Sequence, residues 1–234
     1  MFGLEQTAEI IERCQGRKGE LQLQKRGEEY EIIYNGVFLM ASYNGATERA
    51  AAREALRLVY NRDNGPLKVL MGGLGMGYSL QETLVWKQVE RAVVVEIEPE
   101  IIRWNREILG SINSDVLGDS RTIIVNSDFR EVLANEAEAS LKDPSLCYQM
   151  VMVDTDNGSS WLSLSSNTFF YSTEGLQLIK ACLSASGVAS FWCSRREEAF
   201  EDRLKEVFTE VIFRTEAEKT GLDGCYYLAG KAAL

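Results

Sequence analysis

Short, continuous apolar runs recur along the chain from residue 67 onward, and amphipathic segments separate them. The runs are Lys68–Met71, Ala92–Val95, Thr122–Val125, Met150–Val153 and Val188–Phe191. Their length and β-branched content are typical of strands buried on both faces of a sheet. The intervening helices are predicted at Ser79–Gln88, Pro99–Leu109, Phe129–Ala139 and Thr173–Leu183. Such alternation predicts right-handed crossovers and a mostly parallel sheet, with a binding crevice at the carboxyl ends of the strands.

Two segments near the C-terminus extend this pattern. Glu210–Phe213 and Cys225–Ala229 predict strands that turn back along the edge of the sheet, so five runs and two segments make seven strands. The predicted fold class is therefore α/β, with a Rossmann-like, mostly parallel seven-stranded sheet and helices on both faces.

The first 60 residues show a different pattern, which predicts a small N-terminal unit with a helix and a β-hairpin. Apolar positions at Leu4, Ala8, Ile10 and Ile11 are spaced as one face of a helix over residues 4–15. Strands are predicted at Glu20–Lys25, Tyr30–Tyr34 and Val37–Met40, and a helix at Ala46–Tyr60. Asn35-Gly36 favours the positive φ angles of a tight hairpin turn. We expect this unit over residues 1–60 and a Rossmann-like nucleoside-binding catalytic domain over residues 61–234.

The composition excludes several kinds of chemistry. The chain has 234 residues, a formal net charge of -10, no histidine and five cysteines. Without histidine there is no Ser-His or Cys-His nucleophile pair, no histidine-based zinc triad and no histidine general base. The cysteines are widely spaced and form no C-x-x-C pair, which argues against a disulfide framework and a zinc site. We expect reduced, buried thiols and no metal.

The net charge and the length of the apolar stretches indicate the compartment and the partners of the protein. A net charge of -10 argues against sequence-independent binding to a nucleic-acid backbone and is compatible with a small cationic substrate. The longest apolar stretches are far shorter than the roughly 20 residues that span a bilayer. Residues 1–19 lack the basic start and apolar run of a secretion signal. We expect a cytoplasmic protein with no nucleic-acid partner and no membrane partner.

A glycine-rich loop follows the first strand of the large sheet. Its glycines are Gly72, Gly73, Gly75 and Gly77. Glycines there let the backbone approach a ligand, although a tight turn without a ligand is the alternative. The next strand ends in Glu96, 19 residues beyond Gly77, where a carboxylate can accept hydrogen bonds from ribose hydroxyls. Glu98 and Glu100 are expected at the start of the next helix, so only Glu96 is expected to face the crevice.

Further candidates follow the later strands. Asp128 could accept a hydrogen bond from an adenine amino group while Phe129 packs on the base, and a helix N-cap is an equal alternative. Asp154 could be a base, an ammonium-binding carboxylate or a turn residue, and the lack of histidine makes it the best candidate base. Trp161 and Tyr171 lie near the predicted mouth, where they could cover a cationic acceptor or pack in the core.

Together these features resemble the spermidine synthase-like aminopropyltransferases, which share the fold of class I S-adenosylmethionine-dependent methyltransferases. The similar segments are the N-terminal β unit, Gly72–Gly77, Val95–Glu98, Ser127–Asp128, Tyr148–Asp154, Phe169–Tyr171, Leu178–Lys180 and Gly187–Val188. They follow the family's order and spacing through most of the chain.

The resemblance implies a transferase in which an amine attacks the carbon beside the sulfonium of decarboxylated S-adenosylmethionine and methylthioadenosine leaves. Glu96 would bind the ribose, Asp128 the adenine, and Asp154 would help to remove the amine proton. The implied donor-binding residues are Gly72, Gly73, Gly75, Gly77, Glu96, Ile97, Asp128 and Phe129. The implied acceptor-binding residues are Glu54, Asp156, Trp161 and Tyr171. The resemblance also implies a homodimer.

Two departures from the family's pattern leave alternatives open. The family's glycine loop commonly carries an acidic residue that binds the donor amine, where this chain has Leu74, Gly75 and Met76. A methyltransferase using ordinary S-adenosylmethionine is one alternative, because that donor has a carboxylate of its own. The family's tyrosine-glutamine pair is missing from residues 47–54, where only Glu54 matches. A non-catalytic nucleoside-binding homologue is therefore a second alternative.

Overall fold

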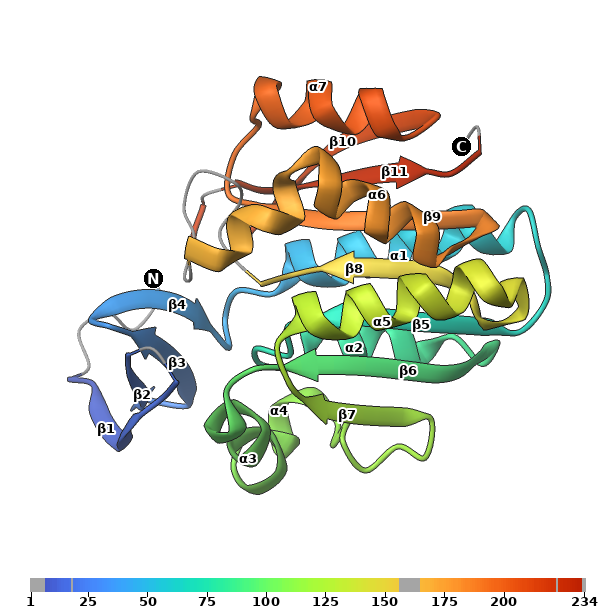
Figure 1. Ribbon diagram of the computed structural model, residues 1–234. Coiled ribbons are helices and arrows are strands. Elements are labelled where there is room, and N and C mark those ends of the chain that lie inside the picture. The colour runs from blue at the N-terminus through green and yellow to red at the C-terminus, as the bar shows by residue number, and fades with distance from the viewer. Residues whose placement is uncertain (1–6, 18, 156–164, 222, 233–234) are drawn as a thin grey trace.

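The computed structural model describes residues 7–17, 19–155, 165–221 and 223–232. Within them the chain forms a small four-stranded sheet and a large seven-stranded sheet (Figure 1). The small sheet is antiparallel throughout, and the large one is mostly parallel. The fold class predicted from the sequence is confirmed.

The large sheet contains every apolar run that predicted a strand. Its strands are β5 Leu67–Gly72, β6 Val89–Glu96, β7 Thr122–Asn126, β8 Tyr148–Val153, β9 Leu183–Cys193, β10 Glu210–Ala217 and β11 Asp223–Gly230. They lie in the order β10-β11-β9-β8-β5-β6-β7. Neighbours from β7 to β9 run parallel, whereas β11 is antiparallel to both β9 and β10. The parallel strands therefore end at one edge, and in Figure 1 the arrows of β6 and β8 point toward the small sheet.

Helices cover both faces of the large sheet (Figure 1). They are α1 Ala46–Tyr60, α2 Tyr78–Val85, α3 Pro99–Glu107, α4 Gly110–Asn113, α5 Phe129–Lys142, α6 Thr173–Cys182 and α7 Glu198–Val207, with 3-10 turns η1 Pro144–Leu146 and η2 Ser165–Tyr171. Successive strand residues point to opposite faces and so enter two different cores. Val69 and Met71 pack in the core that contains α1 and α2, while Leu70 packs in the core that contains α5 and α6.

The N-terminal segment forms a strand, so the helix predicted over residues 4–15 is wrong. The small sheet consists of β1 Glu9–Gln15, β2 Glu20–Arg26, β3 Glu29–Tyr34 and β4 Val37–Ala41, in that order. Glu12 accepts a hydrogen bond from Trp104 Nε1 at 3.0 Å, and Cys14 packs against the core. Alternate residues of β1 thus face the protein, and strand pairing with these long-range contacts outweighs a short helical pattern.

The hairpin turn predicted between β3 and β4 is confirmed. Asn35 has φ 50° and Gly36 has φ 74°, the positive angles that an Asn-Gly turn favours. Helices α4 and α7 and the 3-10 turns were not expected from the sequence pattern. In the described part of the chain, no helix is long and apolar enough to cross a membrane.

Helix α1 packs on the large sheet although it precedes that sheet in the chain. Ala51, Ala55 and Leu56 of α1 are completely buried in the same core as Met152 of β8. Small alanine side chains let the helix backbone lie close to the sheet. The division of the chain at residue 60 stays a prediction. Helix α1 precedes that division, yet it packs in the core of the large sheet that follows it.

Candidate functional site

A cavity lies across the carboxyl ends of the parallel strands. Counted out to its open mouth, and so including space open to solvent, its volume is about 1010 Å³. From β7 across to β9, residues at successive strand ends that line it are Asp128, Glu96, Gly73, Asp154 and Trp192. Since neighbouring strands are about 4.8 Å apart, these residues form a row of roughly 19 Å. The small sheet contributes Leu21, Tyr34, Leu39 and Met40 to the lining.

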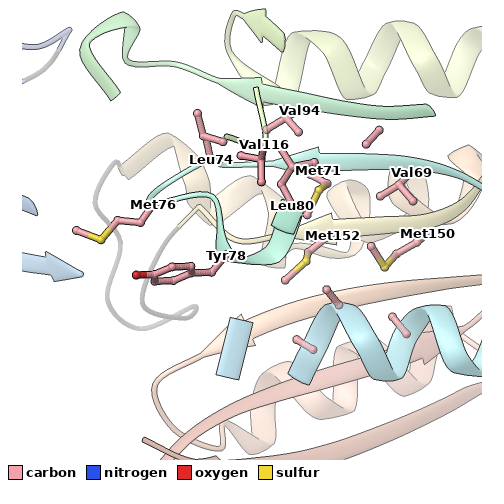
Figure 2. Packing of buried hydrophobic residues seen from close by; sticks show 14 of the residues in the cluster. Val69, Met71, Leu74, Met76, Tyr78, Leu80, Val94, Val116, Met150 and Met152 are labelled. Carbon is pink, nitrogen blue, oxygen red and sulfur yellow. The ribbon is translucent and has the colours of Figure 1, made fainter. Parts of the chain in front are cut away.

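The backbone of the glycine loop faces this cavity. Gly73 and Gly75 line it, while Leu74 and Met76 are buried in the hydrophobic core (Figure 2). Gly73 has φ 97° and Gly75 has φ 52°, a region that favours glycine. A Cβ atom on Gly73 would lie 2.1 Å from the carbonyl oxygen of Asp154. Only glycine therefore lets the loop and the end of β8 come this close.

Two buried asparagines hold the loop in place. Asn105 Nδ2 of α3 donates to the Gly75 carbonyl at 2.8 Å, and Asn113 Nδ2 of α4 donates to the Met76 carbonyl at 3.1 Å. Asn113 Nδ2 also donates to Asn105 Oδ1 at 2.7 Å. Gly77 faces this pair, because a Cβ atom there would lie 3.0 Å from Asn113 Nδ2. The structure thus places Gly77 in the turn into α2 and not in the cavity lining.

Glu96 is buried at the end of β6, and backbone N–H groups hold its carboxylate. The N–H of Leu74 donates to Oε2 and the N–H of Glu98 donates to Oε1, each at 2.9 Å. Burial raises the pKa of Glu96, and these backbone hydrogen bonds oppose that rise. A carboxylate offers about four acceptor positions. Glu96 therefore retains acceptor capacity for hydroxyl groups of a ligand.

Glu98 also reaches the cavity, so the expectation that only Glu96 faces the crevice is wrong. Glu98 is the N-cap residue of α3, as the sequence indicated, yet its side chain lines the cavity. It is only 4% exposed, and it accepts a hydrogen bond from the backbone N–H of Arg17 at 2.8 Å. The contact with the small sheet's β1–β2 connection turns this carboxylate inward, and no local sequence pattern reveals it.

Asp128 and Phe129 meet the cavity at the end of β7. Asp128 Oδ1 accepts a hydrogen bond from the backbone N–H of Arg130 at 2.9 Å, so Asp128 is the N-cap of α5. Phe129 lies with its ring centroid 5.1 Å from that of Phe170, and both rings line the cavity. A Cβ atom on Gly72 would lie 2.3 Å from Phe129 Cδ1, so Gly72 leaves the space that this ring occupies. The capping bond uses one oxygen of Asp128, and the second oxygen can serve a ligand.

Asp154 lines the cavity at the end of β8. Its backbone N–H donates to the Gly72 carbonyl at 2.9 Å, which extends the pairing of β8 with β5. Ser79 Oγ of α2 donates to Asp154 Oδ2 at 3.0 Å. Two strand spacings separate Asp154 from Glu96, about 10 Å. Asp154 is therefore a carboxylate held in a fixed position, and a small-molecule ligand could span the distance between it and Glu96.

Glu48 is a cavity residue that the sequence analysis did not select. It lies in the first turn of α1 and lines the cavity together with Asp154. Burial, with the negative charge of Asp154 as the second cause, raises the pKa of Glu48 to about 8. The sequence did hold a signal, since Glu48 shares a helix face with Ala51, Ala52 and Ala55, which are all buried. A carboxylate on the buried face of a helix is unusual without a partner or a role.

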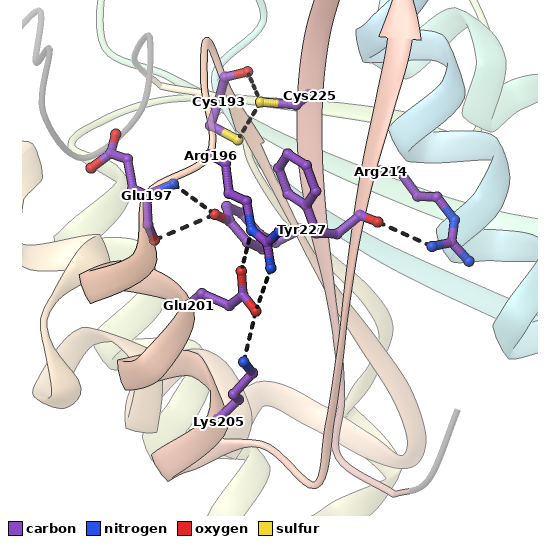
Figure 3. Close-up of polar contacts among 9 residues, drawn as sticks. Cys193, Arg196, Glu197, Glu201, Lys205, Arg214, Cys225 and Tyr227 are labelled. Atoms are coloured by element: carbon purple, nitrogen blue, oxygen red, sulfur yellow. Dashed lines mark hydrogen bonds and ion pairs between the residues drawn. The ribbon is translucent and has the colours of Figure 1, made fainter.

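Trp192 at the end of β9 lines the cavity beyond Asp154. Its indole N–H is buried and has no hydrogen-bond partner among the described residues. The next residue, Cys193, has its Sγ atom 3.2 Å from Cys225 Sγ of β11 (Figure 3). The Glu197 N–H then donates to the Tyr227 hydroxyl at 2.9 Å, which ties the start of α7 to β11. These contacts fix the backbone that carries Trp192.

The sequence profile of the Spermine/spermidine synthase domain matches residues 53–204, more than half of the chain. The chain belongs to the spermine/spermidine synthase family. The resemblance drawn from the motifs is therefore confirmed.

Curated relatives of the spermine/spermidine synthase family are longer than this chain. The polyamine aminopropyltransferase of Aeropyrum pernix is 29% identical over 123 residues, which cover 53% of this chain and 36% of that protein. Polyamine aminopropyltransferase 2 of Pseudomonas aeruginosa is 31% identical over 158 residues, which cover 62% of this chain and 41% of that protein. The chain thus spans less than half the length of these relatives.

Solved structures in the family share the fold. The spermidine synthase from Thermotoga maritima superposes with a TM-score of 0.73 and 18% identity, over 95% of this chain and 73% of that one. A spermidine synthase in complex with the transition state analogue AdoDATO gives a TM-score of 0.76 and 18% identity, over 95% of this chain and 74% of that one. The fold is therefore that of spermidine synthases, which is like that of class I methyltransferases.

Two residues that the family resemblance implied for the acceptor lie outside the cavity. Glu54 is six residues beyond Glu48, which turns it about 120° around the helix axis, and it pairs with Arg57 at 2.7 Å. Tyr171 is only 2% exposed and packs edge-on against Phe200, with ring centroids 5.1 Å apart. Neither side chain lines the cavity.

Asp156 and Trp161, also implied for the acceptor, lie outside the described residues. Within the described ranges, no group of three or more His, Cys, Asp or Glu side chains could hold a metal ion. The cysteines are free thiols, and Cys182, Cys193 and Cys225 are among those that are buried.

Proposed function

We propose that this chain is an aminopropyltransferase that moves an aminopropyl group from decarboxylated S-adenosylmethionine to an amine acceptor. The observation that carries the proposal is the row of Asp128, Glu96 and Asp154 along one cavity, with the glycine-loop backbone between Glu96 and Asp154. Membership of the spermine/spermidine synthase family supports it. So do the names of the curated relatives, which are polyamine aminopropyltransferases.

The donor would lie on the β5, β6 and β7 side of the cavity. Glu96 would accept hydrogen bonds from the ribose hydroxyls through the acceptor positions that Leu74 and Glu98 leave free. Asp128 would accept from the adenine amino group, while Phe129 packs on the base with Ile97 beside it. The adenosyl group would thus bridge the end of β7 and the glycine loop.

The acceptor would meet the donor at Asp154. A neutral nitrogen attacks the carbon beside the sulfonium, so a C–N bond forms and the C–S bond breaks. The electron pair of the broken bond stays on sulfur, which leaves as the thioether of methylthioadenosine. Asp154, held by Ser79 Oγ at 3.0 Å, would orient the nitrogen and take its proton. Alignment of the two reactants would supply much of the acceleration.

A methyltransferase using ordinary S-adenosylmethionine is the second candidate, and one observation favours it. A Cβ atom on Gly75 would lie 2.6 Å from Met40 Sδ. An acidic side chain therefore does not fit there while Met40 keeps its place, and a donor-amine contact of the family's kind is missing. A donor with its own carboxylate would not need that contact.

Melting temperatures with four ligands separate the candidates. The ligands are S-adenosylmethionine, its decarboxylated form, methylthioadenosine and S-adenosylhomocysteine. A ligand at 100 times its Kd stabilises the native state by about 2.7 kcal/mol, or about 5 to 11 °C for a chain of this size. A larger shift with the decarboxylated donor and methylthioadenosine is expected. A larger shift with the other two would favour the methyltransferase.

Turnover of the decarboxylated donor with putrescine tests the reaction itself. We expect Asp154→Asn to lower kcat by at least about 100-fold, because it removes the base, while Asp63→Asn in an exposed loop leaves kcat unchanged. No turnover with any diamine, together with tight binding of S-adenosylhomocysteine, would overturn the proposal. Nucleoside binding without any turnover would indicate the non-catalytic homologue. We also propose a cytoplasmic homodimer on the family resemblance, and sedimentation velocity tests the dimer.

A further inference from the structure

Two carboxylates from different parts of the chain face the acceptor side of the cavity. Asp154 follows β8, and Glu48 lies in the first turn of α1, which begins at the same edge of the sheet. Both side chains line the cavity. The family resemblance accounts for Asp154 alone, and Glu48 has no assigned role.

The surroundings of Glu48 are mostly acidic. The ionisable groups that act on it are Asp154 from β8, Glu218 from the end of β10, Tyr78 from α2 and Arg49 from α1 itself. The Arg49 guanidinium lies 3.8 Å over the Tyr78 ring, and its Nη2 donates to Gln81 Oε1 at 2.6 Å. This cation is therefore occupied with α2. Glu96, Glu98 and Asp128 add further carboxylates to the same cavity.

Two carboxylates that line one partly desolvated cavity and act on each other electrostatically do not both ionise easily. Burial and the charge of Asp154 raise the pKa of Glu48 to about 8, so Glu48 carries a proton at neutral pH before an amine binds. A cation between the carboxylates reverses this effect, because it favours the ionised form of both.

We propose that Glu48 is a specificity-determining residue of the acceptor site, and that with Asp154 it forms a paired-carboxylate subsite for a cationic amine. This inference rests on the proposed function of the cavity. Binding of the amine expels the proton that the empty pair holds, and the ammonium group replaces it. The site thus selects an acceptor that brings positive charge, and it resists an uncharged one of the same shape.

Proton release during binding measures this directly. A carboxyl group with a pKa of about 8 is roughly nine-tenths protonated at pH 7. Putrescine is titrated by calorimetry at pH 7 into protein saturated with methylthioadenosine, in two buffers of different ionisation enthalpy. The buffer dependence of the heat gives the number of protons released.

We expect wild-type protein to release close to one proton more than Glu48→Gln, and Glu48→Gln to bind putrescine about tenfold more weakly. Glu48→Asp, which keeps the carboxyl group, restores part of the release. Glu54→Gln on the same helix is the matched control, since Glu54 lies outside the cavity, and it is expected to match wild type. If Glu48 had only a structural role, Glu48→Gln would not change the number of protons released when putrescine binds.

Two outcomes would overturn the inference, and they differ in what else they affect. If wild-type and Glu48→Gln proteins both bind putrescine and release equal numbers of protons, the inference fails and the proposed function stands. If the methylthioadenosine complex of the wild type binds no putrescine, both fail. Melting curves of each variant with methylthioadenosine show that the donor side is intact.

Discussion

Helix α1 receives its N-terminal cap from the other end of the chain, and removing that cap gives the sharpest stability prediction. The N-cap residue is Gly45, which has no side chain to offer. Glu218, just after β10, supplies the carboxylate instead. It accepts hydrogen bonds from the backbone N–H of Thr47 at 2.8 Å and of Gly45 at 3.2 Å, and from Thr47 Oγ1 at 2.6 Å. The hairpin fits closely there, since a Cβ atom on Gly224 would lie 2.2 Å from Thr47 Oγ1.

The magnitude follows from these contacts. Losing an N-cap costs about 0.5–2 kcal/mol, and a hydrogen bond to a charged group contributes about 1.5–3 kcal/mol. Glu218 is half-buried, so we take the lower part of each range and expect Glu218→Ala to lower the free energy of unfolding by about 2–3 kcal/mol. For a chain of this size that corresponds to about 4 to 12 °C in Tm.

Urea unfolding followed by circular dichroism measures this loss. The matched control is Glu216→Ala on the same hairpin, because Glu216 pairs with Gly224 through the β10–β11 ladder and its side chain makes no hydrogen bond or ion pair with the described residues. In the Glu218→Ala background, Thr47→Val should add little, since the hydroxyl has already lost its acceptor. A Glu218→Ala protein within about 0.5 kcal/mol of the control would refute the capping argument.

Two further predictions concern the cavity walls. In urea unfolding, Gly73→Ala should destabilise the protein by at least about 2 kcal/mol more than Gly36→Ala. Both glycines have positive φ, but a Cβ atom on Gly73 would lie 2.1 Å from a backbone oxygen, while one on Gly36 would meet open space. Equal losses of stability in the two variants would contradict this prediction. Glu48 has a folded-state pKa raised from 4.5 to about 8, so the folded protein holds more protons than the unfolded chain and loses stability as pH rises through that window. The free energy of unfolding should therefore fall between pH 6 and pH 9 by about 2–3 kcal/mol more in wild type than in Glu48→Gln, and parallel pH profiles would count against it.

The residues that line the proposed donor side of the cavity come from features that lie close together in the sequence. The glycine loop and Glu96 belong to one strand–loop–helix–strand unit, and Asp128 and Asp154 each follow directly on an apolar strand. Since parallel strands end at one edge, their order in the chain was enough to predict that these residues meet. Their roles toward a ligand stay proposals.

The proposed acceptor side was harder to predict, because α1 meets the large sheet only through long-range packing. Glu48 and Glu54 are both acidic residues of one helix, and the motif comparison favoured Glu54. The rotation of α1 on the sheet decides between them, and the buried alanine stripe sets that rotation. Periodicity along the helix therefore indicated the cavity residue better than the motif did.

The sequence by itself determined the seven strands, the Asn-Gly hairpin, the helix at Ala46–Tyr60 and the glycine loop, because each depends on residues near one another in the chain. Only the tertiary structure decided that residues 9–15 pair as β1, that Glu98 turns into the cavity, and that Glu218 caps a helix 171 residues away. Those outcomes depend on partners that the local pattern does not contain. Whether a segment pairs as a strand, and whether a charged side chain is buried, depends on which groups from distant parts of the chain the fold brings within hydrogen-bond distance.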